Sequence, residues 1–342
     1  MAFDSARAEF QEVVRSNPDH PAGYFFLGMV DWWVILIDID NESHDEEFLA
    51  TMDRVIAICD KRLDKDENDL AGLFFKGGAL GFQGRLHANR EDWVKAASAG
   101  HSALDLVIKA YKIAPNNYDV LFGMGIYDYY AAVIPEQYPF VKPLMLLFPK
   151  GDKDKGIEQL RQAVQHASYA NREAAYFLIQ IFINYEKRYG EALPLAAELH
   201  NQFPDNPVYH RYVGRSYAAV NDWTDTRTTY AEILACANRH KFGYGVSDER
   251  EAHYYLGLMD MNEEKFDPAL QHFYKCDELS RTLDKSGPSG FMAMTNLKIG
   301  MVYDLQSKRD LAIAQYNKVL KMPDYQGSQK LAERFLARAY GK

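Results

Sequence analysis

The sequence predicts an all-α chain built as a solenoid of about seven helix pairs with a C-terminal capping helix. Two observations support this prediction. A short apolar, aromatic-rich motif recurs along the 342 residues and ends each time at one anchor position. After several anchors a small residue follows at a fixed distance, and an aromatic residue comes four positions later. Such self-similarity is the signature of stacked helical repeats. The anchors are Gly28, Gly77, Gly125, Gln180, Gly214, Gly257 and Gly300.

The internal offsets are clearest after the last two anchors. The small and aromatic positions there are Ala269 with Phe273 and Ala312 with Tyr316. A small residue lets neighbouring helices approach closely, and the aromatic residue fills the gap between successive pairs. These residues resemble the tetratricopeptide repeat (TPR), a unit of about 34 residues with Leu-Gly on its first helix (helix A) and Ala and an aromatic residue on its second (helix B). The resemblance covers essentially the whole chain and implies a right-handed superhelix whose A helices line a concave surface.

The anchors also predict where the repeats lengthen. Successive anchors lie 49, 48, 55, 34, 43 and 43 residues apart. We place the first three excesses between helices A and B, and the last two between repeats. About fourteen extra residues add about two turns to each of two antiparallel helices and preserve the face that each presents. The predicted single solenoid over 1–342 contains a half repeat at 3–18, long repeats at 21–67, 70–115 and 118–168, standard repeats at 173–204, 207–238, 250–281 and 293–324, and a capping helix at 328–340.

The N-terminal segment 3–18 reads as a helix B that no helix A precedes. Either an upstream segment, such as a signal sequence plus helix A, has been removed, or this helix is a modest cap. The start of the given chain, MAFDSARAEF, has no apolar signal-peptide core. The clipped appearance favours the bacterial cell envelope (periplasm), and a cytoplasmic location stays open.

The long and standard repeats carry local helix signals. GALGFQGRLHANR continues helix A of the second long repeat, and EDWVKAASAGHSALDLVIKAY forms a long helix B. In the third, Pro135, Pro139, Pro143 and Pro149 surround the apolar run LMLLF. This run is too short to span a membrane, so we assign it to an insertion between helices A and B. Asn206 before Pro207, and Asp267 before Pro268, predict the starts of two later helices.

Composition excludes several classes of function. The net charge of −9 disfavours a nucleic-acid partner, which would select a basic face. No apolar run reaches the length of a membrane span. The three cysteines, Cys59, Cys236 and Cys276, have no metal or disulfide spacing and are predicted to be small core residues.

The TPR resemblance implies which side chains face the concave surface. Helix A positions three before the anchor give an aromatic ladder and then a charged position, and further aromatic residues lie along the lengthened helices. The predicted concave binding residues are Phe25, Phe74, Phe122, Phe177, Tyr254, Tyr129, Tyr130, Arg211 and Arg215. An apolar N-terminal trough of this size needs a cover.

Two interpretations of the trough stay open. In the first, the insertion folds into it and fills it with Phe140, Leu144, Met145, Leu147 and Phe148. In the second, part of the trough remains open to a hydrophobic peptide, an acyl chain or a partner helix.

Arg211 and Arg215 lie four residues apart on one helical face. Two guanidinium groups could bind a carboxylate or phosphate through bidentate hydrogen bonds. The alternative is internal pairing, with Glu251 of the next repeat within reach. The basic clamp of some TPR proteins uses lysines and asparagines at defined positions, which this chain does not reproduce.

No motif indicates catalysis. GGALGFQG lacks the preceding strand and the following Lys-Ser/Thr of a phosphate loop, and the ten histidines show no metal-ligand spacing. We therefore expect no cofactor, no metal and no catalytic residues, and a non-catalytic scaffold that binds a protein or peptide. The alternatives are a carrier of an apolar ligand in the trough and an enzyme with an unrecognised site. The segment FGMGIYDYY…IPEQYPFVKPLMLLFPKGDKDKGIEQL resembles one in bacterial TPR proteins of unassigned role and, more distantly, in the tetratricopeptide repeat protein thirty-nine family.

Overall fold

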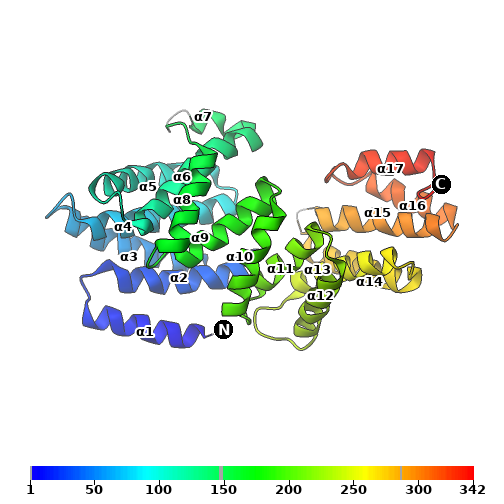
Figure 1. Cartoon of the computed structure of the whole chain (residues 1–342), viewed down its shortest axis with the longest axis horizontal. Coiled ribbons are helices and arrows are strands. Elements are labelled where there is room, and N and C mark those ends of the chain that lie inside the picture. The colour runs from blue at the N-terminus through cyan, green and yellow to red at the C-terminus, as the bar shows by residue number, and fades with distance from the viewer. Residues whose placement is uncertain (1, 146–148, 286) are drawn as a thin grey trace. The chain divides into compact units, whose positions relative to one another are not determined.

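The computed structural model describes residues 2–145, 149–285 and 287–342, and every regular element in these ranges is a helix (Figure 1). The chain divides into two compact units, Met1–Leu195 (unit 1) and Ala196–Lys342 (unit 2). Their boundary falls inside one helix, α10 (Tyr189–Gln202). The all-α prediction is confirmed, whereas a single solenoid over 1–342 stays a prediction.

Unit 1 consists of consecutive helices that pack in pairs. They are α1 (Phe3–Ser16), α2 (Pro21–Ile37), α3 (Asp45–Leu63), α4 (Leu70–Asn89), α5 (Trp93–Ile113), α6 (Tyr118–Gln137), the 3-10 helix η1 (Pro139–Val141), α7 (Lys142–Met145), α8 (Lys153–His166), α9 (Asn171–Gln180), the π-helix η2 (Ile181–Tyr185) and the first part of α10. The A and B helices of the long repeats pack on one another as α2 with α3, α4 with α5 and α6 with α8.

Unit 2 continues the alternation of A and B helices. After the end of α10 come α11 (Pro207–Ala219), α12 (Trp223–Asn238), α13 (Val246–Asn262), α14 (Phe266–Leu283), α15 (Gly290–Leu305), α16 (Arg309–Val319) and α17 (Ser328–Ala337). The pairs are α11 with α12, α13 with α14 and α15 with α16, and α17 caps the last pair. Asn206 caps α11 as predicted, its side chain accepting from the backbone N–H of Val208 at 2.9 Å. The predicted start at Pro268 is wrong, because α14 begins two residues earlier at Phe266.

The last two anchor glycines lie where the helices of a pair approach closely. A Cβ atom added at Gly257 would lie 2.8 Å from Cδ1 of Phe273, and one at Gly300 would lie 2.5 Å from Cε1 of Tyr316. Both rings are completely buried, as are Ala269 and Ala312 one turn earlier. Only glycine leaves room for an aromatic ring at this distance. The recurring glycine and aromatic residue of the sequence motif therefore reflect this packing.

Helix lengths follow the predicted division in the first two long repeats. Helices α2 to α5 have 17, 19, 20 and 21 residues, whereas α11 and α12 have 13 and 16. The expectation of standard lengths fails for α13 and α14, which have 17 and 18 residues and are as long as α2. In the third long repeat only helix A is lengthened, since α6 has 20 residues and α8 has 14. Pro135 lies in the last turn of α6, which therefore extends further than the proline suggested. The remaining excess forms the insertion between Tyr138 and Asp152.

In both units, side chains on the buried faces of the helices form the core. Cys59, Cys236 and Cys276 are buried and free, which confirms their prediction as core residues. The amphipathic capping helix α17 places Phe335 against Tyr316, with ring centroids 5.7 Å apart. Helix α17 thereby covers the apolar face of the last helix pair, which would otherwise be exposed to water.

Candidate functional site

The rings predicted to line the trough of unit 1 pack against one another. Phe122 contacts Phe177 edge-on with centroids 5.6 Å apart, and Phe25 contacts Phe75 and Phe82. Four of these side chains are buried, with at most 9% exposure: Phe25, Phe122, Phe177 and Tyr129. Phe74 and Tyr130 are half-buried. These side chains therefore form part of the core of unit 1 in this conformation.

Helix α9 closes the trough from the opposite side. Trp33 of α2 contacts Tyr176 of α9 with centroids 5.3 Å apart, although 143 residues separate them in sequence. Phe26 of α2 contacts Tyr169, which precedes α9, at 5.8 Å. The turn before α9 is held by the buried carboxylate of Asp119, which accepts from the backbone N–H groups of Tyr169 and Ala170, both at 2.8 Å. The first and fourth A helices thus meet across the trough.

The described part of the insertion contacts other residues than those of the trough. Phe140 is 61% exposed and packs against Trp93 and Tyr138, with centroids 5.5 and 6.1 Å away. At its other end, Tyr127 donates a hydrogen bond to the carbonyl of Pro149. The expectation that Phe140 fills the trough is wrong, because the rings of α9 occupy that space. Leu147 and Phe148 lie outside the described residues, as do the side chains of Leu144 and Met145.

Arg85 of α4 is a residue in the trough that the sequence reasoning missed. Its guanidinium lies 4.2 Å from the ring centroid of Phe177 and 5.3 Å from that of Trp32. Nη2 donates to Oε1 of Gln180 at 2.9 Å, whereas Nη1 is buried and has no hydrogen-bond partner among the residues described. Arg85 lies eleven residues after Phe74, three helical turns along the same face. Extending the concave stripe along the lengthened helix would have found it.

The two arginines of unit 2 form internal ion pairs. Arg215 makes a bidentate contact with Glu251, with Nε to Oε1 at 2.7 Å and Nη2 to Oε2 at 2.5 Å. Arg211 pairs with the buried carboxylate of Asp248. Burial opposes ionisation of Glu251, but the attraction of Arg215 outweighs it and lowers the pKa of Glu251. The arrangement is the internal pairing that the sequence offered as the alternative to a clamp.

A half-buried surface remains on the A helices α13 and α15. Tyr254 contacts Phe291 edge-on with centroids 5.5 Å apart. Met294 and Lys298 follow Phe291 on α15 at three and seven residues, on one face of the helix. Burial alone lowers the pKa of Lys298, which forms no ion pair with any residue that the structure describes. We call these four residues the α13–α15 face.

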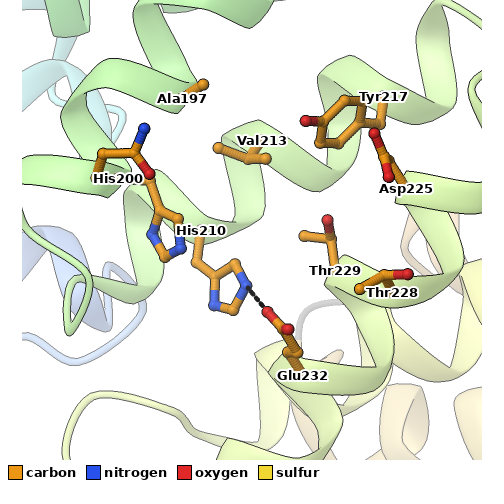
Figure 2. Close-up of a pocket in the computed structure, with 10 residues that line it drawn as sticks. Ala197, His200, His210, Val213, Tyr217, Asp225, Thr228, Thr229 and Glu232 are labelled. Carbon is orange, nitrogen blue, oxygen red and sulfur yellow. Dashed lines mark ion pairs between the residues drawn. The ribbon is translucent and has the colours of Figure 1, made fainter.

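A cavity of about 250 Å³ opens between the end of α10, α11 and α12 (Figure 2). Its lining is mixed and includes two carboxylates, two imidazoles and two threonine hydroxyls. The lining residues are Ala197, His200, Asn201, His210, Val213, Tyr217, Asp225, Thr228, Thr229 and Glu232. The rings of His200 and His210 stack with centroids 4.3 Å apart, and Nε2 of His210 lies 3.6 Å from Oε2 of Glu232 (Figure 2).

The two imidazoles of the cavity are neutral at pH 7. Burial lowers the pKa of His210 to about 3, with smaller contributions from His200 and Lys241. Burial also lowers the pKa of His200. The second nitrogen of His210, Nδ1, is 2.9 Å from the hydroxyl of Tyr244. The cavity therefore presents two carboxylates without a compensating positive charge from its own imidazoles.

This cavity was not predicted from the sequence. His200, His210 and Glu232 come from three different helices and match no motif. The only available signal was the concentration of polar residues on α12, which is ordinary for an exposed helix B face. Within the described ranges, no three His, Cys, Asp or Glu side chains are grouped to hold a metal ion. None of the described helices has both the length and the apolarity needed to cross a bilayer.

The alternating helix pairs and the glycine–aromatic contacts give each unit the helix-pair arrangement of tetratricopeptide repeats, which confirms the predicted all-α repeat fold. No known family model matches the sequence, and no curated protein matches it. Solved structures with a similar arrangement include PilF of Pseudomonas aeruginosa, with 15% identity over 75% of this chain and 97% of that one and a TM-score of 0.46.

Two other structures are similar at the same level. Yeast Tom70 has 15% identity over 87% of this chain and 60% of its own, with a TM-score of 0.44. A tetratricopeptide repeat protein from Parabacteroides merdae has 11% identity over 88% and 97%, with a TM-score of 0.42. At these values the likeness carries no functional argument, and the function has to be inferred from the surfaces of this chain.

Proposed function

We propose that this chain is a non-catalytic scaffold that binds a protein partner along the A helices of unit 2. The partner segment combines apolar side chains with a carboxylate and lies on the α13–α15 face. Tyr254, Phe291 and Met294 are half-buried on this face, with Tyr254 and Phe291 in contact, and they can gain further apolar contact.

The observation that carries the proposal is Lys298. An ammonium group that is partly removed from water without a counter-ion lowers the stability of a protein unless something else compensates. No carboxylate within the described part of the chain pairs with it. A carboxylate from a partner would supply the missing charge and would restore the ordinary pKa of the lysine.

Affinity capture from the source organism, with the immobilised full chain and its Lys298→Met variant, tests the proposal. We expect a protein that the wild type retains to be lost by the variant, while the variant is as stable as the wild type or more so. Lys318→Met is the matched control, because Lys318 is an exposed lysine on the neighbouring helix α16. Equal retention of every captured protein by Lys298→Met and wild type would contradict the proposal.

Arg85 favours a second candidate function, in which unit 1 carries an apolar ligand that has an anionic group. The buried Nη1 atom of Arg85 has no hydrogen-bond partner within the described part of the chain, and aromatic rings surround its guanidinium. An anion at Nη1 would require α9 to separate from α2 and expose the trough. Native mass spectrometry of the purified chain would detect a retained ligand. A mass equal to that of the bare chain, for protein purified from its source organism, would reject this candidate.

A further inference from the structure

The cavity between α10, α11 and α12 is lined by two exposed carboxylates and by no lysine or arginine. Elsewhere in the unit, buried carboxylates pair with an arginine; the described pairs are Arg211 with Asp248, Arg215 with Glu251, Arg227 with Asp260, Arg250 with Asp284, Arg281 with Asp277 and Arg309 with Asp304. Asp225 and Glu232 at the cavity pair with no lysine or arginine that the structure describes. The nearest cation that influences both imidazoles, Lys241, is engaged with Asp205 at 2.7 Å.

The dimensions of the cavity restrict its occupant. About 250 Å³ is below the usual range of cofactor and drug-sized sites, which begins at about 300 Å³, and suits a single side chain. Glu232 is 63% exposed at the rim, whereas Val213 and Thr229 are buried at the floor. An elongated group entering from solvent would pass the carboxylate before reaching the floor.

The lining chemistry favours a guanidinium over an ammonium group. A guanidinium has five N–H donors in one plane, and two carboxylates, the amide oxygen of Asn201 and two threonine hydroxyls offer acceptors around the cavity. The flat rings of His200 and Tyr217 also line it, and a guanidinium stacks on such rings. Since both imidazoles are neutral, neither repels a cation.

We propose that this cavity binds an arginine side chain presented by a partner protein, with Glu232 and Asp225 as its counter-ions. The incoming arginine would form, between two proteins, the kind of arginine–carboxylate pair that recurs inside unit 2. The site uses none of the residues of the α13–α15 face and does not depend on the function proposed for that face.

Titration of the full chain with N-acetyl-arginine amide tests the proposal. The readout is the imidazole resonances of His200 and His210 at pH 7 and low salt, assigned with the variants His200→Gln and His210→Gln. We expect saturable shifts of both resonances at millimolar concentration. N-acetyl-citrulline amide, a neutral molecule of nearly the same shape, should bind at least about tenfold more weakly, because a charge-assisted hydrogen bond is lost.

Two variants locate the effect. Glu232→Gln should weaken binding of the arginine derivative by about tenfold. Glu198→Gln, which changes an exposed carboxylate on α10 that already accepts from Gln202 at 3.1 Å, should leave it unchanged. The proposal is overturned if the citrulline derivative binds as tightly, if Glu232→Gln has no effect, or if N-acetyl-lysine amide or spermidine binds more tightly than the arginine derivative.

Discussion

Replacement of Arg215 by methionine should strongly destabilise unit 2. The variant keeps the length and apolar stem of the side chain but removes both hydrogen bonds to Glu251. Among the described residues, the carboxylate of Glu251, only 3% exposed, would then keep one hydrogen bond, from the hydroxyl of Tyr230 at 2.9 Å. The buried carboxylate of Glu251 would then either stay charged with no positive group beside it to offset its lost hydration, or take up a proton.

The magnitude follows from the geometry of the pair. Removal of one member of a buried ion pair costs roughly 3–5 kcal/mol. Because the side chain of Arg215 is 33% exposed, water can partly replace it, and we expect a loss near the lower limit, about 3 kcal/mol. With a urea dependence of about 2 kcal/mol per molar, the unfolding midpoint should fall by about 1.5 M.

Urea unfolding followed by circular dichroism measures this shift, and hydrogen exchange locates it. Protection should fall mainly in α11, α12 and α13, which contribute Arg215, Tyr230 and Glu251. The double variant Arg215→Met with Glu251→Gln removes both charges and should recover most of the loss, to within about 1 kcal/mol of the wild type.

The double variant also decides whether the reasoning is correct. If it is as unstable as Arg215→Met alone, lost packing rather than an unpaired carboxylate is responsible. If Arg215→Met costs less than about 1 kcal/mol, the bidentate pair contributes no more than an exposed ion pair does.

Three further predictions concern the histidines and the glycines. Burial lowers the pKa of His210 to about 3 and that of His253 to about 4. Because the folded chain takes up a proton at these imidazoles less readily than the unfolded chain, the stabilisation is complete above pH 6.5 and is lost as the pH falls towards these pKa values. At pH 5 urea unfolding should show a loss of about 2 kcal/mol for each, and the variant His210→Asn should lose correspondingly less between pH 7 and pH 5. Gly300→Ala should cost about 1–3 kcal/mol in thermal unfolding, since its Cβ would collide with the buried ring of Tyr316; an unchanged stability would mean that the ring moves aside. Gly190→Ala in α10, where a Cβ would meet no atom within 4 Å, should instead stabilise by about 0.5–1 kcal/mol, and a loss there would contradict the open space.

The repeat architecture could be predicted from the sequence because its determinants are local. The Gly257–Phe273 contact joins residues sixteen apart, within one helix pair, and a fixed offset therefore records it. The lengths of α2 to α5 were predictable for the same reason, since whole turns were added to both helices of a pair. The start of α14 was misplaced because Pro268 is tolerated in the first turn of a helix as well as at its first position.

The candidate sites depend on contacts that no local pattern records. The meeting of Trp33 and Tyr176 depends on the accumulated rotation of several helix pairs, each of which has lengthened helices. We predicted that Phe140 lies in the trough because an apolar trough has to be covered. In the structure, α9 and the turn before it cover the trough instead. The cavity at His210 and Glu232 lies between three helices, and the sequence of any one of these helices alone does not predict it.

The contact between α2 and α9 changes how unit 1 should fold. In an open array each repeat touches only its neighbours, so terminal repeats can fray while the remainder stays ordered. Here Trp33 and Tyr176 connect the first repeat to the fourth across 143 residues, and Phe26 and Tyr169 add a second link. Such nonlocal contacts slow folding because a large loop must close before they form. Unit 1 should therefore unfold as one cooperative block, and deletion of its first repeat should loosen α9 as much as it loosens α4.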